Sequence, residues 1–111
     1  MKIKNKVQLI GNLGNDPKIT KLEKGNMLAK FSIATNESYL NKVGERVENT
    51  QWHNVIAWGK TAEIVEKILK KGNEVVIDGK LINRTYEDDK GVKHYITEIQ
   101  ANELLKISAK E

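Results

Sequence analysis

Apolar and polar residues alternate along most of this chain, and that period of two predicts β-strands with one buried and one exposed face. In the first such segment, Val7, Leu9 and Gly11 fall on one side of the predicted strand. The same alternation predicts five strands in all, at residues 6–13, 27–36, 50–58, 74–82 and 95–104. In the fourth strand, Gly79 indicates a bend or bulge, because glycine packs no side chain against a neighbouring strand.

One segment breaks the alternation and predicts a helix. Across residues 61–71 the apolar positions change to helical spacing, and Gly72 follows where a glycine would end a helix. The predicted apolar stripe of this helix consists of Ile64, Val65, Ile68 and Leu69. The helix therefore separates the third predicted strand from the fourth.

Two long polar connections complete the predicted fold. Residues 39–49 and 83–94 are polar and centred on glycine, which favours β-ribbons that protrude from the body. The resulting order of elements is that of the OB-fold, a five-stranded Greek-key barrel that commonly binds single strands across its face. We therefore predict an all-β OB-fold with one helix between strands three and four. We place this domain at residues 1–107, with residues 108–111 as a short C-terminal remainder.

Trp52 and Trp58 are the residues that say most about function. They lie six positions apart in one predicted strand and so leave it on the same face, opposite Val55. A lone strand tryptophan is more often a core residue. Here, however, alternation assigns Phe31 to the inside, and the two tryptophans share the outer face near Lys60. Paired aromatics beside a cation suit stacking on the bases of an unpaired nucleic acid strand.

Composition narrows the class of protein. The 111 residues, 39% hydrophobic and 31% charged, fit one globular domain with a modest core. A net charge of +4 favours a polyanionic partner, although that charge alone is weak evidence. The absence of cysteine excludes disulfides, a thiolate nucleophile and cysteine metal ligands. The lysine-rich start has no apolar run that suits a signal peptide or a membrane anchor, so we expect a cytoplasmic protein without a membrane partner.

Four sequence blocks together resemble the bacterial single-stranded DNA-binding proteins. They are NKVQLIGNLGNDP at residues 5–17, FSIATNES at 31–38, WHNVIAWGKTAE at 52–63 and KKGNEVVIDGKL at 70–81. Each block is moderately specific by itself, but four in order at the right separations are strong evidence. The resemblance covers nearly the whole chain and implies an OB-fold protein that binds single-stranded DNA with little sequence preference. It also implies a role in DNA replication, recombination and repair, close to the nucleoid.

The resemblance also implies which residues touch DNA. The stacking aromatics of the family fall on Tyr39, Trp52, Trp58 and Tyr86, and its basic and polar backbone contacts fall on Lys6, Asn12, Lys60, Lys71 and Arg84. Asn54 and Ile82 stand where arginine is frequent, which removes positive charge. Lys30, at a position that is often neutral, returns part of that charge, so we include it among the DNA-binding residues.

The assembly expected from the resemblance is a homotetramer whose dimers form through the first strands. His53 matches a position that the family places in a subunit contact, although a half-buried histidine at the edge of the core is an equally ordinary interpretation. Family members commonly continue into a flexible linker and an acidic tail that recruits partner enzymes. This sequence ends at Glu111 without such a tail. Two explanations stay open: the sequence is the folded part of a longer protein, or it is a short natural form. We therefore expect no tail-mediated recruitment of replication or repair enzymes.

Other candidate sites favour structural interpretations. Glu87, Asp88 and Asp89 are consecutive at a predicted hairpin tip, where turn chemistry is more common than a metal site. The two histidines, His53 and His94, lack the spacing of a zinc site. We therefore predict no catalytic residue, no metal and no cofactor. One alternative remains open. The chain would be an OB-fold module, as in a primosome, that uses the same face to bind protein and binds DNA only secondarily.

Overall fold

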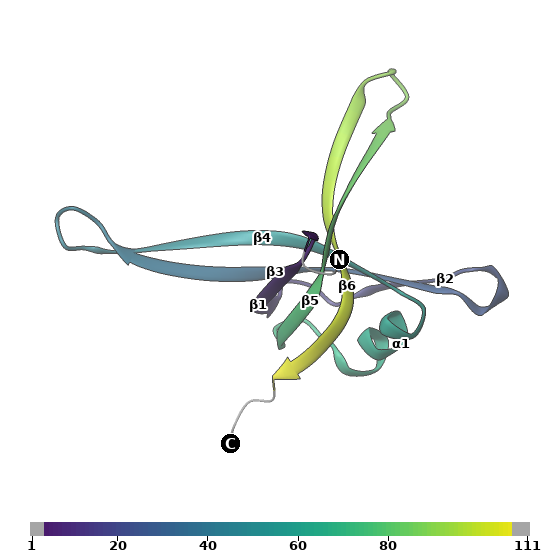
Figure 1. Ribbon diagram of the computed structural model, residues 1–111, viewed down its shortest axis with the longest axis horizontal. Coiled ribbons are helices and arrows are strands. Elements are labelled where there is room, and N and C mark those ends of the chain that lie inside the picture. Colours follow the sequence, from purple (N-terminus) through teal and green to yellow (C-terminus); the bar gives the residue numbers. More distant parts are fainter. Residues whose placement is uncertain (1–3, 108–111) are drawn as a thin grey trace.

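The computed structural model describes residues 4–107, and its element order is that of a barrel with one helix (Figure 1). The strands are β1 (Val7–Leu13), β2 (Lys18–Lys21), β3 (Met27–Leu40), β4 (Arg46–Trp58), β5 (Glu74–Glu87) and β6 (Lys93–Ile107), with a 3-10 helix at Glu23–Gly25 and helix α1 at Gly59–Ile68. The predicted C-terminal remainder, residues 108–111, lies outside the described residues.

The strands close into a barrel. Hydrogen-bonded neighbours follow the order β1-β5-β6-β4-β3-β2, and a further pairing of β1 with β3 completes the ring. All pairings are antiparallel except the short contact of β4 with β6, where Val55 lies opposite Ile99. The five predicted strands correspond to β1, β3, β4, β5 and β6, and α1 connects β4 to β5. The predicted all-β barrel with a helix between its third and fourth strands is confirmed.

Inward-facing residues of the barrel strands form the core together with one side of α1. The largest fully buried side chains include Ile33, Val55 and Ile77, and Phe31 is only 4% exposed, as the alternation predicts. The predicted helix stripe was partly wrong. Ile64 and Ile68 are 45% and 37% exposed, while the buried face consists of Ala62, Val65 and, just past the helix, Leu69.

The difference is one of helical phase. The side that packs on the barrel is formed by Ala62, Val65 and Leu69, and Ile64 and Ile68 lie at the margin of this side, toward solvent. Gly72 does not end the helix. It has a φ of +91° in the turn before β5, and its N–H donates to the carbonyl of Leu13 at 2.9 Å. The turn after the helix is thereby fixed to the end of β1.

The two predicted ribbons are the most extended parts of the molecule. The β3–β4 ladder continues out to the pair Leu40–Arg46, and the β5–β6 ladder to the pair Glu87–Lys93. Figure 1 shows the two hairpins leaving the barrel in different directions. The predicted irregularity at Gly79 is also confirmed, because the β5–β6 register shifts between Asp78 and Gly79.

Strand β2 and the 3-10 helix were not predicted. β2 has four residues, KITK, of which only Ile19 is partly buried, so its sequence carries almost no alternation. It pairs with the start of β3 and forms a third, shorter ribbon. None of the helices in residues 4–107 is long and apolar enough to span a membrane.

Candidate nucleic-acid interface

The outer face of the β3–β4 pair carries both tryptophans. The register sets Trp58 opposite Leu28 and Trp52 opposite Ala34, and opposite residues of an antiparallel pair share a face. Trp52 is 62% exposed and Trp58 is 47% exposed. They are six positions apart in β4, a span of about 20 Å at the usual rise per residue. The two indoles therefore lie near the two ends of one strip of surface.

A groove runs along this strip between the tryptophans. One part is lined by Asn15, Lys18, Lys30, Ser32, Asn54, Ile56 and Glu98, and the adjoining part by Leu28, Lys30, Ile56, Trp58, Ile82 and Arg84. The two parts share Lys30 and Ile56, so they form one continuous surface, which we call the groove. Ile56 has the same parity as Trp52 and Trp58 and so faces outward, yet it is only 5% exposed, which gives the groove an apolar floor. Basic and polar side chains line its sides.

Trp52 lies directly over a glycine. A Cβ atom built on Gly14 would overlap Cζ3 of the Trp52 ring and lie 2.8 Å from its Cη2. The neighbouring backbone is held in place by Ser32, whose N–H and hydroxyl both donate to Oδ1 of Asn15, at 3.1 and 2.8 Å. The end of the groove at Trp52 is therefore built by the segment after β1, which packs under the indole.

The β5–β6 hairpin extends the groove outward. Ile82, Arg84 and Tyr86 alternate along one face of β5, and Tyr86 lies opposite His94 of β6. The Tyr86 and His94 rings are stacked, with centroids 4.9 Å apart and an interplanar angle of 18°. Tyr86 is 50% exposed, so the other side of its ring is open to a ligand. The hairpin thereby adds an aromatic surface beyond Trp58.

The acidic tip of the same hairpin has a structural role. Oδ1 of Asp88 accepts hydrogen bonds from the N–H groups of Lys90 and Val92, and its Oδ2 lies 2.8 Å from Nε2 of His94. The hydrogen bond with His94 and, to a smaller extent, the hydrogen bond from the N–H of Val92 lower the pKa of Asp88 below its ordinary value. No group of three His, Asp or Glu side chains in residues 4–107 is arranged to hold a metal.

A single ion pair occupies the centre of the groove. Nε of Arg84 lies 2.8 Å from Oε1 of Glu98. Glu98 is 6% exposed and is the only buried charged residue within the described range. The hydrogen bond to Glu98 and its negative charge raise the pKa of Arg84 above its ordinary value. The guanidinium therefore stays protonated, with a fixed partner at its Nε.

Three other predicted residues lie at the ends of the groove. Asn12 is opposite Ala34, so it shares a face with Trp52, and its Nδ2 donates to the carbonyl of Gly72 at 3.2 Å. Lys71 precedes Gly72, which brings it to the same end. Lys60 follows Trp58 in the first turn of α1. The structure thus brings seven predicted positions to one surface or its margins: Asn12, Lys30, Trp52, Trp58, Lys60, Lys71 and Arg84, with Tyr86 on the adjoining hairpin.

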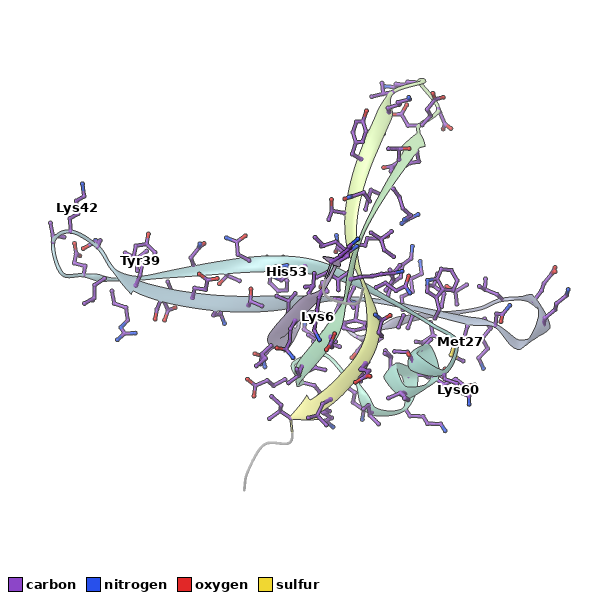
Figure 2. The ribbon with its side chains drawn as sticks, viewed as in Figure 1. Lys6, Met27, Tyr39, Lys42, His53 and Lys60 are labelled. Atoms are coloured by element: carbon purple, nitrogen blue, oxygen red, sulfur yellow. The ribbon has the colours of Figure 1, made fainter. Side chains whose placement is uncertain are left out.

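The remaining predicted residues lie apart from the groove. Lys6 forms an ion pair with Asp78 at 3.3 Å on the β1–β5 side of the barrel. Tyr39 is 56% exposed. It lies an odd number of positions from Ala34, the residue opposite Trp52, so it leaves the β3–β4 hairpin on the face opposite to Trp52. Figure 2 shows Tyr39 far out on that hairpin, well away from Lys60.

His53 lies on the inner side of β4 and is half-buried. Its Nε2 is 3.0 Å from Oγ1 of Thr35, and the methyl group of Thr35 lies close to Gly11 of β1. The ring is therefore connected, through one residue, to the strand that the sequence predicts at the subunit contact.

Sequence reasoning missed Asn15, Lys18 and Glu98 as groove residues. Asn15 lies inside one of the blocks that carry the family resemblance, so that signal was available. Lys18 lies in the short strand β2, which was not predicted. Glu98 lies between Thr97 and Ile99 in an alternating strand, at a position where a solvated polar residue is expected, and nothing in its local sequence distinguishes it from one.

Comparison with known proteins agrees with this geometry. Residues 4–107 match the family model described as the single-strand binding protein family. The chain belongs to this family. It is 43% identical to single-stranded DNA-binding protein 1 of Chlorobaculum tepidum, over 96% of this chain and 67% of that protein. It is 42% identical to single-stranded DNA-binding protein 1 of Xylella fastidiosa, over 96% of this chain and 79% of that protein.

Solved structures of related proteins show the same fold. The SSB of Plasmodium falciparum, in a complex with single-stranded DNA, superposes with a TM-score of 0.88 at 31% identity, covering 97% of this chain and 98% of the other. A deletion mutant of the single-stranded DNA-binding protein of Thermus aquaticus has a TM-score of 0.83 at 24% identity, covering 96% of this chain and 51% of the other. The predicted OB-fold is thereby confirmed.

Proposed function

We propose that this chain binds single-stranded DNA with little sequence preference, in replication, recombination and repair, and that it performs no catalysis. The observation that carries the proposal is the groove, which has a half-exposed tryptophan near each end and lysines along its sides. Family membership supports it, as does the likeness to the P. falciparum protein in complex with single-stranded DNA. The nucleoid in the cytoplasm is the location that suits this function.

Bases and phosphates use different parts of the groove. Bases stack on Trp52, Trp58 and Tyr86, and because every base has a π-face, stacking tolerates any sequence. Phosphates meet Lys30 and Arg84 along the groove, and further basic and polar contacts lie at its ends. The stacking mechanism is common to the family. The position of Trp52 and Trp58 on one face of the β3–β4 pair, with Tyr86 on the adjoining hairpin, supports this proposal.

We also propose that the chain assembles into a homotetramer. Residues 7–11 of β1 pair with β5 on one side, and the β3 pairing reaches only Asn12 and Leu13, so much of the other edge of β1 is free to add a second strand. Ile10, Val76 and Leu105 are opposite one another across β1, β5 and β6, and form an apolar row on the outer face. Ile10 is 56% exposed and Leu105 is 65% exposed, which is typical of a surface that packs against a partner.

A fluorescence titration tests the DNA-binding proposal. Adding oligo(dT) should quench the tryptophan emission, because both indoles stack on bases. The β5–β6 hairpin offers a matched pair of variants: Tyr86 lies on the groove side, whereas Tyr95, 78% exposed, lies opposite Thr85 on the other face. Tyr86→Ala should weaken binding by roughly 1–3 kcal/mol, the usual loss per stacked base.

The control variant Tyr95→Ala should bind like the unmodified chain. A titration without quenching would instead favour a module that docks protein on this face. Equal losses in the two tyrosine variants would show that the groove is not the path of the strand.

A further inference from the structure

Glu98 is out of place in a groove that binds a polyanion. It is the only buried charged side chain within residues 4–107, and it lies among the groove residues beside Asn54 and Ile56. A carboxylate here repels phosphates and loses its own hydration. Neither stacking nor phosphate binding requires it, so its presence calls for a separate explanation.

The contact of Glu98 with Arg84 supplies one. In the β5–β6 ladder Glu98 lies opposite Ile82, and Arg84 lies opposite Ile96, so the two charged side chains are diagonal neighbours on one face. The carboxylate meets the guanidinium through Nε, at 2.8 Å, and not through its outer edge. The side chain of Arg84 remains 48% exposed, whereas that of Glu98 is 7% exposed. The buried partner thus holds the inner part of an otherwise accessible arginine.

The geometry of the guanidinium turns this contact into a means of orientation. The group is planar and carries its five N–H donors in a fixed arrangement. A bond at Nε therefore fixes the plane and leaves the four N–H donors of Nη1 and Nη2 free. An arginine held in this way loses less conformational freedom when it binds, so more of the binding energy is retained.

We propose that Glu98 is a positioning residue: it holds Arg84 so that Nη1 and Nη2 meet a phosphate of the strand in the groove. This inference rests on the proposed function. It predicts a result opposite to that of simple electrostatics. If Glu98 acted only through its charge, removing it would strengthen DNA binding; if it positions Arg84, removing it weakens binding.

Four variants separate these effects. Glu98→Met keeps the length of the side chain but loses the acceptor, and Glu98→Gln keeps an acceptor oxygen without the charge. Arg84→Ala and the double variant Glu98→Met/Arg84→Ala complete a cycle. Glu63→Met, at an exposed position on α1, matches the change in net charge away from the groove. The measurements are the dissociation constant for oligo(dT) at several salt concentrations and the melting temperature.

We expect Glu98→Met to weaken binding about two- to tenfold, the range expected for one hydrogen bond. Its log–log salt slope should become shallower by about 0.7, the value of one phosphate contact on a single strand. Arg84→Ala should do the same, the double variant should bind no worse than Arg84→Ala, and Glu98→Gln should recover most of the affinity. Arg84→Ala alone should also lower the melting temperature, because it leaves a buried carboxylate unpaired, and the double variant should regain that loss.

Tighter binding by Glu98→Met than by Glu63→Met, or an unchanged salt slope, would overturn the positioning role while leaving DNA binding in place. Additive losses in the double variant would also overturn it, because Glu98 would then act independently of Arg84. An unmodified chain that does not bind oligo(dT) would overturn the proposed function and this inference together.

Discussion

The packing of Trp52 on Gly14 allows the stacking surface to be disturbed without removing an aromatic ring. Gly14 is not among the glycines with positive φ, so its backbone tolerates a side chain. A Cβ at this position would overlap the indole, and the flexible ring is the part that must move. We therefore expect Gly14→Ala to keep the fold and to displace Trp52 from its place at the end of the groove.

The loss of DNA affinity in Gly14→Ala cannot exceed the free energy of one base stacked on Trp52. Losing a stacked base costs roughly 1–3 kcal/mol, and a displaced ring should lose about half of that. The predicted loss is thus about two- to twelvefold in affinity at 25 °C. Trp52→Ala should show the full loss. Since Trp52 is 62% exposed, about 100 Å² of a large aromatic side chain is covered, and the stability cost should not exceed about 2.5 kcal/mol.

The assay is a double-mutant cycle measured by fluorescence anisotropy of labelled oligo(dT). Gly14→Ala should weaken binding in the unmodified chain and have almost no effect in the Trp52→Ala background, because the ring that it displaces is absent there. The melting temperatures show whether each variant is folded. Equal losses in both backgrounds would mean that Gly14 acts through something other than Trp52, and no loss in either would refute the reasoning.

Three further predictions concern charge, duplex DNA and pH. Lys60→Ala should reduce the salt slope by about 0.7 and act alike on oligo(dT) and mixed sequences; a strong sequence preference would contradict this mechanism. Double-stranded DNA of equal length should bind far more weakly in a filter-binding assay, because its bases are hidden in the duplex, and equal binding would indicate a general polycation effect. Asp88→Asn should lower the melting temperature at pH 7. Because the folded pKa of Asp88 is lowered, its stabilisation is complete above about pH 4 and lost as the pH falls through the folded pKa, so the two melting curves should converge in acid.

The sequence predicted the barrel strands well because each of them separates a buried face from an exposed one. Phe31 and Val55 are inside and Trp52 is outside, in agreement with simple alternation. The helix was harder to predict. Its apolar spacing identified Ile64 and Ile68, but the buried side uses the small residue Ala62, which an apolar pattern does not emphasise.

Arg84 and Lys30 were predicted as DNA-binding residues, but the contact of Arg84 with Glu98 and the burial of Ile56 could not be predicted, because they depend on contacts between distant strands. Glu98 and Arg84 are separated by 14 positions and meet only through the β5–β6 register. Ile56 is outward-facing and would be exposed on an isolated sheet, yet here it is only 5% exposed. Alternation specifies the face on which a side chain lies, and the rest of the fold decides whether that face meets water.

Tyr39 shows that the face on which a side chain lies also matters for DNA binding. Its position has the same parity as Phe31 along β3, so it leaves the strand on the barrel's inner side even though the hairpin has carried it beyond the barrel. Trp52, Trp58 and Tyr86 border one continuous surface, whereas Tyr39 belongs to the reverse face of the β3–β4 hairpin. For the DNA-binding mode proposed above, one strand could stack on all four rings only by passing around the edge of that hairpin. A contact of Tyr39 with DNA would otherwise require a strand bound on a neighbouring subunit of the proposed tetramer. The position of this one tyrosine therefore links the path of the DNA to the proposed tetramer.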